Sequence, residues 1–498
     1  MPHVRRLARF FACLASAAAF LGVTVVQAAD DEAGFKPIFN GQNLDGWDGD
    51  AKFWSVQDGA ITGRTTPENP TSGNTFLIWR QGEVDDFELR LSYRIVGHNS
   101  GVQYRSADLG NHVVGGYQAD IEAGDTYTGI LYDERGRGIL AARGEKTVVG
   151  IDHKPQKTGS VGDSAELQKA IKKEDWNDYT IIAEGNHLRH FINGKQTCDV
   201  TDEDPKDREL TGILALQLHA GPPMTVQFKN IRLRRLKLTG DRKKIVMVAG
   251  SASHGKGEHE FNAGITVLRH CLDNFPDMVL PAEYHNGWPA DATAFDNADA
   301  VLLYMDGGGG HPLIRPDHLR RIGELMHQGV GLACAHYAVE VPQDRGGPEL
   351  LAWIGGYYET GYSINPHWDA DFQKLPDSPL TRGVKPFKIN DEWYYNMRFR
   401  EGAVTPILEA TPPDSTRGTP AAKEHPGRKE IVAWTTQRPD GGRGFGFTGG
   451  HFHRNWGNPD FRKLVLNALF WVAKAEVPAN GVECEVAQEE LAKNLDTK

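Results

Sequence analysis

The sequence predicts a multidomain protein, with an N-terminal all-β sandwich or jelly roll followed by an α/β domain built on a parallel sheet. Its 498 residues exceed what one hydrophobic core usually supports. Up to about residue 238, short alternating strands are separated by turn residues, and helical periodicity is almost absent. Beyond residue 242, continuous apolar runs alternate with amphipathic helices, which is typical of a doubly wound parallel sheet. We therefore expect domains at residues 30–238 and 242–475, after a signal peptide at residues 1–29 and before a polar tail at residues 476–498.

The first 29 residues have the composition of a secretory signal peptide. Three arginines within the first nine residues precede an apolar run, and small residues lead to a cleavage site near Ala29 or Asp30. A retained membrane anchor is the alternative, but the polar DDEAG that follows favours cleavage. We expect a periplasmic or secreted protein without stable membrane insertion.

Charge and cysteine content narrow the possible partners. The formal net charge is −11 and no basic cluster stands out, which argues against nucleic acid and anionic membranes as partners. The four cysteines beyond the signal peptide (Cys198, Cys271, Cys334 and Cys484) are widely spaced and form no CxxC pair. Neither a disulfide framework nor a cysteine zinc site is indicated, although a single bridge in an oxidising compartment remains open. The oligomeric state is not predicted.

The strand pattern of the first domain is clearest in DFELRLSYRI. Its alternation places residues 87, 89, 91, 93 and 95 on one apolar face. DYTIIAEGNHLRHFINGKQT is interrupted by turn residues at 184–186 and 193–194, and VQFKNIRLRRL closes the region. These many short strands predict the sandwich.

Three further strands carry long polar side chains on one face. In SGVQYRS, GGYQADIEAG and GILALQLHAG, polar residues alternate with apolar ones. Because successive strand residues point to opposite faces, each segment offers one apolar and one polar face. We expect the polar faces to gather in a cleft with the lining of a sugar-binding or sugar-cleaving site. The polar residues are Gln103, Arg105, Gln118, Asp120, Glu122, Gln217 and His219.

These motifs, together with GFKPIFNGQNLDGW and FWSVQDGAITG, resemble the 3-keto-disaccharide hydrolase family. The resemblance covers nearly all of residues 35–237. It implies a concanavalin-like β-sandwich that acts on glycosides oxidised at the 3-position of the sugar, by hydrolysis or by elimination.

The residues of the polar face suit this chemistry. A 3-keto group acidifies the C2 proton, so elimination needs a base near C2, a cation beside the enolate and an acid for the leaving oxygen. Asp120 and Glu134 are the carboxylate candidates, His219 is a possible base or metal ligand, and Arg105 would stabilise the enolate. Three glutamines could bind hydroxyl groups, and Tyr117, a core or rim residue, is included among the substrate-side candidates. The glutamines are Gln103, Gln118 and Gln217.

Each carboxylate also has a structural alternative. Asp120 could be solvated or paired with an arginine, as acids on sheet faces usually are. Glu134 lies in YDERGRG, where a loop salt bridge to Arg135 or Arg137 is an alternative to catalysis.

In the second domain, histidines follow the predicted strands. KKIVMVAG, ADAVLLYMDGGGG and GVGLACAH are predicted buried strands, PDHLRRIGELMHQG and LVLNALFWVAK are predicted helices, and GRGFGFTGGHFH supplies two further histidines. Ligands of open parallel sheets bind beyond the C-terminal strand ends, where these histidines lie. Converging imidazoles and carboxylates suit zinc, manganese or iron. We expect a divalent metal, the only cofactor predicted, to bind some subset of His259, His336, His451 and His453.

The remaining candidates of this site are assigned to the substrate. His254, Asp391 and Glu392 could bind it, and the two acids could also close the metal site or act as a base. His451 and His453, two residues apart on a strand end, would point the same way. The alternative is that one caps a loop while the other hydrogen-bonds a carbonyl.

These phrases, with DEWYYNMRF, resemble the trehalose-utilisation (ThuA-like) family over residues 243–474 or so. The resemblance implies a fold related to the class I glutamine amidotransferases, flavodoxin-like in its sheet, and a link to 3-keto-sugar metabolism. Amidotransferase chemistry would need a cysteine on the strand-to-helix elbow. In GLACAHYA the elbow falls on His336 and Cys334 lies inside the strand, so we predict no glutaminase activity.

The expected function is cleavage of 3-keto-glycosides in oxidised-sugar catabolism, with a small oxidised saccharide as the partner. The alternative is a binding protein, in which a non-catalytic, lectin-like sandwich is attached to a scaffold or metal-binding α/β domain.

Overall fold

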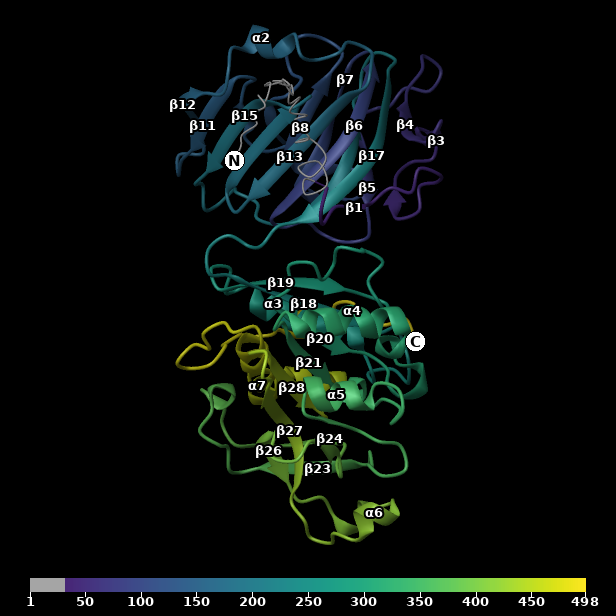
Figure 1. The fold of residues 1–498 in the computed structure, drawn as a ribbon, viewed down its shortest axis with the longest axis vertical. Helices are drawn as coiled ribbons and strands as arrows, with labels where there is room; N and C mark the ends of the chain where they lie inside the picture. The colour runs from purple at the N-terminus through teal and green to yellow at the C-terminus, as the bar shows by residue number, and fades with distance from the viewer. Residues whose placement is uncertain (1–31) are drawn as a thin grey trace, which may run out of the picture. The chain divides into compact units, whose positions relative to one another are not determined.

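The computed structural model describes residues 32–498, and Figure 1 shows the two large β-sheet regions and the helices of the second half. The predicted signal peptide, residues 1–29, lies outside the described residues.

Two sheets form the N-terminal sandwich. The ten-stranded sheet has the order β12-β11-β15-β14-β13-β6-β17-β4-β3, with β1 paired to β17. Its strands are β1 (Lys36–Pro37), β3 (Trp54–Gln57), β4 (Ala60–Arg64), β6 (Phe87–Val96), β11 (Glu145–Val149), β12 (Pro155–Ser160), β13 (Asn177–Glu184), β14 (His187–Ile192), β15 (Lys195–Asp202) and β17 (Thr225–Arg235).

The seven-stranded sheet has the order β10-β9-β8-β7-β16-β5-β2. Its strands are β2 (Trp47–Asp48), β5 (Thr75–Trp79), β7 (Asn99–Asp108), β8 (Val114–Glu122), β9 (Leu131–Glu134), β10 (Gly138–Ala141) and β16 (Ile213–Leu218). One short helix, α2 (Ser164–Gln168), is the only α-helix between residues 36 and 235. The predicted β fold class is thereby confirmed.

Strand alternation builds the core between the two sheets. The apolar face predicted for β6 is buried, and its residues pack with Tyr117, Ala119 and Ile121 of β8. Leu214, Leu216 and Leu218 of β16 belong to the same core. Because the apolar side chains of β8 and β16 face inward, their polar neighbours face the opposite side of the seven-stranded sheet.

An irregularity in β7 overturns the predicted position of Arg105. The register of β7 with β8 shifts between Tyr104 and Ala107, and Arg105 itself has a positive φ of 47°. Such a bulge breaks the alternation and re-aims the side chain. Arg105 is fully buried and donates to Asp86 Oδ1 over 2.8 Å and to the carbonyl oxygen of Asp85 over 2.7 Å. Its expected place on the polar face beside Gln103 is therefore wrong, and the guanidinium is part of a buried ion pair.

The second half contains a seven-stranded sheet in the order β19-β18-β20-β21-β28-β27-β26. Pairing is parallel from β19 to β28 and antiparallel from β28 to β26, so the predicted parallel sheet has an antiparallel edge. The strands are β18 (Lys243–Ala249), β19 (Val279–Tyr284), β20 (Ala300–Tyr304), β21 (Gly331–Ala335), β26 (Thr405–Ala410), β27 (Glu430–Gln437) and β28 (Arg443–Phe447).

Helices cover both faces of this sheet, as the continuous apolar strands predict. One face packs against α3 (Phe261–Leu272) and α7 (Pro459–Val472), and the other against α4 (Pro316–His327) and α5 (Gly347–Trp353). The smaller elements are α6 (Pro420–Lys423), α8 (Gln488–Leu491) and two two-stranded antiparallel sheets. These sheets pair β22 (Gly356–Tyr357) with β25 (Arg398–Phe399) and β23 (His367–Phe372) with β24 (Phe387–Glu392).

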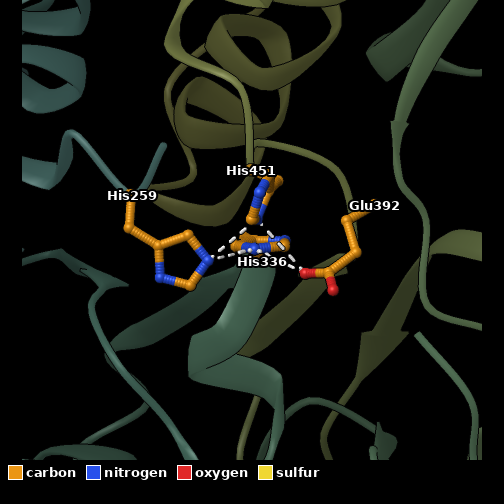
Figure 2. Close-up of side chains that lie close together, drawn as sticks. All are labelled: His259, His336, Glu392 and His451. Carbon is orange, nitrogen blue, oxygen red and sulfur yellow. Dashed lines mark hydrogen bonds and ion pairs between the residues drawn. The ribbon is translucent and has the colours of Figure 1, made fainter. Parts of the chain in front are cut away.

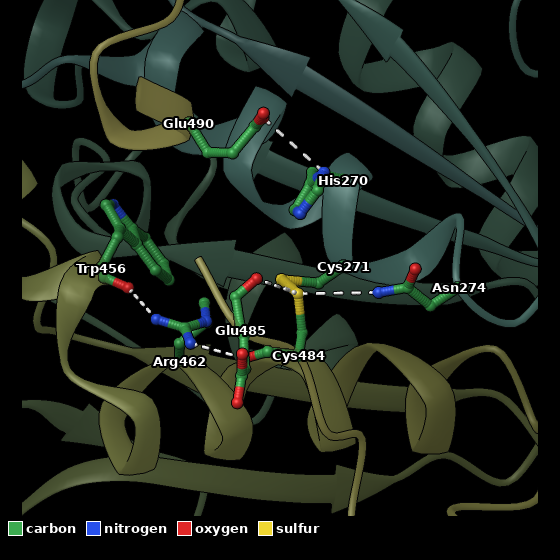
Figure 3. The surroundings of a disulfide bond; sticks show 8 residues. All are labelled: His270, Cys271, Asn274, Trp456, Arg462, Cys484, Glu485 and Glu490. Carbon is green, nitrogen blue, oxygen red and sulfur yellow. Dashed lines mark hydrogen bonds and ion pairs between the residues drawn. A yellow bond between two sulfur atoms is a disulfide. The ribbon is translucent and has the colours of Figure 1, made fainter. Parts of the chain in front are cut away.

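The C-terminal segment packs on the α/β domain. Cys484 forms a disulfide with Cys271 of α3 (Figure 3), a bridge that the cysteine spacing left open. Arg462 of α7 donates to the carbonyl oxygen of Cys484 over 2.7 Å, and Leu491 of α8 is buried. The polar tail expected at residues 476–498 is thus an ordered cover with one helical turn. No helix among residues 32–498 has the length and apolar character that spanning a bilayer requires.

Candidate functional sites

A cavity of about 460 Å³ opens on the polar side of the seven-stranded sheet of the N-terminal sandwich. Its acidic and imidazole lining comes from the predicted strands: Asp120 and Glu122 from β8, Glu134 from the end of β9, and His219 from directly after β16. The volume lies within the roughly 300–1,000 Å³ that small-molecule sites usually have. Strand alternation therefore gathers Asp120, Glu134, His219 and Gln118 into one hollow.

Asp120 is the acid of this cavity whose pKa is shifted the most. It is 5 % exposed, and one carboxyl oxygen lies 3.2 Å from both Gln118 Nε2 and the Ile121 amide. Burial raises the pKa of Asp120 to about 8, although hydrogen bonds from Asn99 and Gln118 oppose the shift. Asp120 is therefore protonated at neutral pH and can donate a proton.

A layer of amides beneath the cavity holds the carboxyls. Gln103, fully buried, donates from Nε2 to Gln118 Oε1 over 2.9 Å, and Gln118 in turn contacts Asp120. Gln217, also fully buried, donates from Nε2 to Glu134 Oε2 over 3.4 Å. Gln103 and Gln217, predicted to bind hydroxyl groups, instead position Gln118 and Glu134.

Glu134 is not part of the arginine salt bridge that its sequence context suggested. Arg137 pairs with Asp133 over 2.8 Å and with Asp202 over 2.8 Å. Among residues 32–498, the hydrogen bonds to the Glu134 carboxylate come from two amides, Asn74 over 3.3 Å and Gln217 over 3.4 Å. Its carboxyl group is therefore available to the cavity.

His219 lies at the cavity rim beside His98, which the sequence analysis missed. The two rings are 4.6 Å apart between centroids, and His219 Nδ1 lies 2.7 Å from the carbonyl oxygen of Ala220. His98 occupies a turn between β6 and β7 with a φ of +56°. Strand alternation says nothing about the direction of a turn residue, so no signal could place His98 here.

Tyr117 is a core residue and does not line this cavity. It is 1 % exposed, its ring lies 5.7 Å from that of Tyr104, and its hydroxyl donates to Asp202 Oδ2 over 2.5 Å. The assignment of Tyr117 to the substrate is corrected, because the alternation of β8 turns it inward.

The α/β domain brings a second group of side chains together: His259, His336, His451 and Glu392, each of which offers one ligand atom within 4.8 Å of the others (Figure 2). His259 precedes α3, His336 follows β21, His451 follows β28, and Glu392 ends β24. The three imidazoles are almost fully buried. Three of the four predicted metal candidates therefore meet, with a carboxylate in place of the fourth.

The contacts within this group are close. His259 Nε2 lies 3.0 Å from His336 Nε2 and 3.0 Å from His451 Nδ1. Glu392 Oε2 lies 3.2 Å from His451 Nδ1 and 3.6 Å from His336 Nε2. Glu392, predicted for the substrate, is thus a member of the histidine group.

Partners outside the group orient two of the rings. His336 Nδ1 lies 3.0 Å from the carbonyl oxygen of Thr448, and His259 Nδ1 lies 3.0 Å from Asp306 Oδ1. Burial lowers the pKa of both His336 and His259, so both rings favour the neutral form. Asp306 lies two residues beyond the end of β20, at the C-terminal strand ends where the sequence pattern places it.

His453 is the metal candidate that the structure separates from the others. His453 Nε2 lies 2.8 Å from the carbonyl oxygen of Leu491, so the predicted alternative of a carbonyl partner applies. The expected parallel orientation of His451 and His453 fails because the strand has already ended and His453 begins a 3₁₀ turn, His453–Gly457.

Asp391 and His254 differ in their roles. Asp391 is fully buried and accepts hydrogen bonds from the backbone amides of Gly450, His451 and Phe452. It therefore shapes the loop that carries His451, and its assignment to the substrate is corrected. His254 is more than one-third exposed, with its ring 3.6 Å from that of His259, and borders the group on its solvent side.

The elbow after β21 carries His336 with a positive φ of 53°, as the sequence predicts. Cys334 lies within the buried strand, and burial raises the pKa of its thiol far above the usual range. Cys334 therefore lies inside the strand, as the sequence predicts, and not on the elbow that a glutaminase nucleophile occupies.

The sandwich with its acidic cavity and the α/β domain with its histidine group define a two-part protein, and each part matches a carbohydrate-related family. Residues 34–234 match the model of the 3-keto-alpha-glucoside-1,2-lyase-like domain, and residues 254–472 match that of trehalose utilisation (ThuA). Both resemblances drawn from the sequence motifs are confirmed.

Solved structures align with one half of the chain at a time. A provisionally named glycosyl hydrolase of Parabacteroides distasonis is 21% identical and covers 41% of this chain and 99% of its own, with a TM-score of 0.29. A provisionally named ThuA-like protein of Parabacteroides merdae is 18% identical and covers 47% of this chain and 90% of its own, with a TM-score of 0.34. The carbohydrate-binding module CBM66 of Bacillus subtilis is 16% identical and covers 39% and 98%, with a TM-score of 0.27. No curated protein matches the chain.

Proposed function

We propose that the sandwich cavity cleaves 3-keto-glycosides by removing the C2 proton and eliminating the group at C1. The observation that carries this proposal is the pairing of two unlike carboxyl groups in one cavity. Asp120 is buried, with a pKa of about 8, whereas Glu134 accepts amide hydrogen bonds. Elimination needs one proton acceptor and one proton donor around the same sugar ring.

In this mechanism Glu134 takes the proton from C2, and the electrons of the C2–H bond form the C1=C2 double bond. The C1–O bond breaks as Asp120 gives its proton to the leaving glycosidic oxygen. The products are an alcohol and a 1,2-unsaturated 3-keto sugar. Addition of water across the double bond then gives the free 3-keto sugar, so that the net reaction is hydrolysis. Proton transfer by a positioned side chain typically accelerates a reaction by about 10²–10⁴-fold.

The direct test is to incubate the purified full-length protein with a 3-keto-glycoside in D₂O, with divalent metal present, and to follow the sugar by NMR. We expect release of the alcohol together with deuterium at C2 of the recovered sugar, because the proton that leaves C2 is replaced from solvent. Glu134→Gln should slow both by about 10²-fold or more. Glu166→Gln, an exposed carboxyl on α2, is the matched control and should leave the rate unchanged.

Three outcomes would contradict the proposal. Cleavage without deuterium at C2 would replace elimination by direct displacement. Full activity in Glu134→Gln would remove Glu134 as the base. Saturable binding of the 3-keto-glycoside with no turnover would favour the lectin-like alternative.

We also propose that the protein is exported before it acts. The basic and apolar composition of residues 1–26 supports export, and so does the disulfide between Cys271 and Cys484, because such bonds persist in oxidising compartments. Mass spectrometry of the protein from cells that export it should find an N-terminus near Ala29 or Asp30, and an intact Met1 would contradict this.

A further inference from the structure

In the histidine group of the α/β domain, two hydrogen-bond acceptors face each other with no hydrogen between them. A carbonyl oxygen only accepts hydrogen bonds, so the contact with Thr448 fixes the proton of His336 on Nδ1. Asp306 Oδ1 in the same way fixes the proton of His259 on Nδ1. Both rings then point bare Nε2 lone pairs at each other over 3.0 Å.

The other two members add to this excess of acceptors. Glu392 Oε2 approaches His336 Nε2 and His451 Nδ1, and a carboxylate also only accepts. A proton on His451 Nδ1 could satisfy one of its neighbours. It would leave the contact between His336 and His259 without any hydrogen, and both rings are at most 1 % exposed. Adding a charge there by protonation is costly in so buried a place.

From this arrangement we infer that His259, His336, His451 and Glu392 bind one divalent first-row transition metal ion through three imidazole nitrogens and one carboxylate oxygen. A cation at the centre converts the four facing lone pairs from a repulsive set into a ligand set. Zinc at about 2.0–2.1 Å from each of four tetrahedral ligands would separate neighbouring ligand atoms by about 3.3–3.4 Å. Four of the six separations among the ligand atoms, 3.0, 3.0, 3.2 and 3.6 Å, lie around that value. All six are within 4.8 Å, so the group needs only small side-chain shifts to close around an ion.

The donor set also selects the class of metal. Three imidazoles suit zinc, iron, cobalt or nickel, whereas magnesium and calcium prefer oxygen ligands throughout. Asp306 and the Thr448 carbonyl supply the outer contacts that ligating histidines usually have.

Backbone conformation supports the same conclusion. His259 and His336 have φ values of +46° and +53°, and neighbouring His254 has +60°. Such a conformation is costly for a residue with a Cβ and is retained at sites where side-chain placement matters. Asp391 adds to this by binding three successive amides of the loop that carries His451.

The test uses the full-length protein purified without a histidine tag, stripped with a chelator and then titrated with Zn²⁺ or Co²⁺. We expect about one equivalent to bind, visible cobalt absorption bands with nitrogen ligation, and a metal-dependent rise in melting temperature. His336→Ala and Glu392→Gln should each weaken metal binding by more than about 10²-fold, since a lost ligand should cost at least as much as a lost outer contact.

His453→Ala is the matched control, because this buried histidine is two residues from His451 and its side chain is hydrogen-bonded to the Leu491 carbonyl, away from the histidine group. It should bind metal as the unmodified protein does. Failure of the unmodified protein to bind either metal at saturating concentration would overturn the inference. So would metal binding that survives in His336→Ala and Glu392→Gln. The spectrum of the unmodified protein decides the matter even where a variant fails to fold.

Discussion

The two sites differ in how the chain assembles them. The sandwich cavity takes its acids from within and at the ends of paired strands, where the alternation of β8 and β9 fixes the direction of each side chain. The histidine group takes His336 from directly after β21, and His259 and His451 from the loops before α3 and after β28. Side-chain direction within a strand follows from local geometry, whereas direction beyond a strand end depends on the loop. The first kind of site is therefore easier to predict in detail, and the second only in location.

The electrostatics of the two sites also differ. In the cavity, burial raises the pKa of Asp120, so the carboxyl group keeps its proton and the site holds a neutral acid. In the histidine group, Asp306 and Thr448 hold the protons of His259 and His336 on the outer nitrogens, so the Nε2 lone pairs of both rings face the centre. One arrangement suits proton transfer and the other suits a cation, which predicts that the two sites fail independently.

The largest expected effect comes from comparing the cleavage rate and the metal content of two variants, Asp120→Asn and His336→Ala. This comparison tests whether the two sites are independent. Asparagine keeps the shape of Asp120 but has no acidic proton, so 3-keto-glycoside cleavage should fall by about 10²–10⁴-fold while metal content stays at one equivalent. His336→Ala should lose the metal and keep the rate of C2 deuterium exchange. The paired measurement is elemental analysis and NMR on the same preparations. Loss of both properties in either variant would show that the two sites act as one.

The sequence was sufficient for the fold class and for the strand-borne part of the cavity. Asp120, Gln118 and His219 were predicted from alternation alone, and the structure places them around one hollow. The predicted position of Arg105 was wrong because a bulge, which depends on the partner strand, breaks the alternation. His98 was missed because it lies in a turn.

In the α/β domain, the rule of strand ends located the histidines but could not assign their partners. His453 was expected beside His451, yet the 3₁₀ turn that begins at His453 directs it to Leu491. Asp391 and Glu392 were treated alike, although alternation along β24 sends one to backbone amides and the other to the histidines. These outcomes depend on tertiary contacts, which the local pattern does not contain.

Asp306→Asn should have an intermediate effect, confined to the histidine group. The carboxylate orients His259 through Nδ1, and an amide can present its nitrogen or its oxygen there, so the bare Nε2 is no longer enforced. Metal affinity should fall by about 10–100-fold, the usual cost of losing an outer carboxylate. Competition with a chromophoric chelator measures the change. Unchanged affinity would mean that Asp306 does not set the orientation of His259, and cleavage of the 3-keto-glycoside serves as the control that should not change.

The smallest expected effect is on the pH dependence of the cavity. Because Asp120 must be protonated to act as the acid, cleavage should fall with increasing pH above a midpoint of about 8, the pKa that burial gives it. The same shift has a consequence for stability. The pKa of Asp120 in the folded protein lies above that in the unfolded chain, so ionisation opposes folding, and stability should fall as pH rises from about 4 to about 8. Asp120→Asn should not show this part of the loss.

Glu122→Gln provides the finer test of that midpoint. The negative charge of Glu122 is one of the influences that raise the pKa of Asp120, and the smallest of those that act on it. Removing the charge makes ionisation of Asp120 easier, so the midpoint should move to lower pH by less than about one unit. The glutamine oxygen can still accept from the amides of Thr126 and Tyr127, as Glu122 does over 2.9 and 2.8 Å, which keeps the loop in place. Rate profiles of the two proteins between pH 6 and 10 measure the difference. A midpoint that moves upward, or one that persists in Asp120→Asn, would assign the titrating acid to another group.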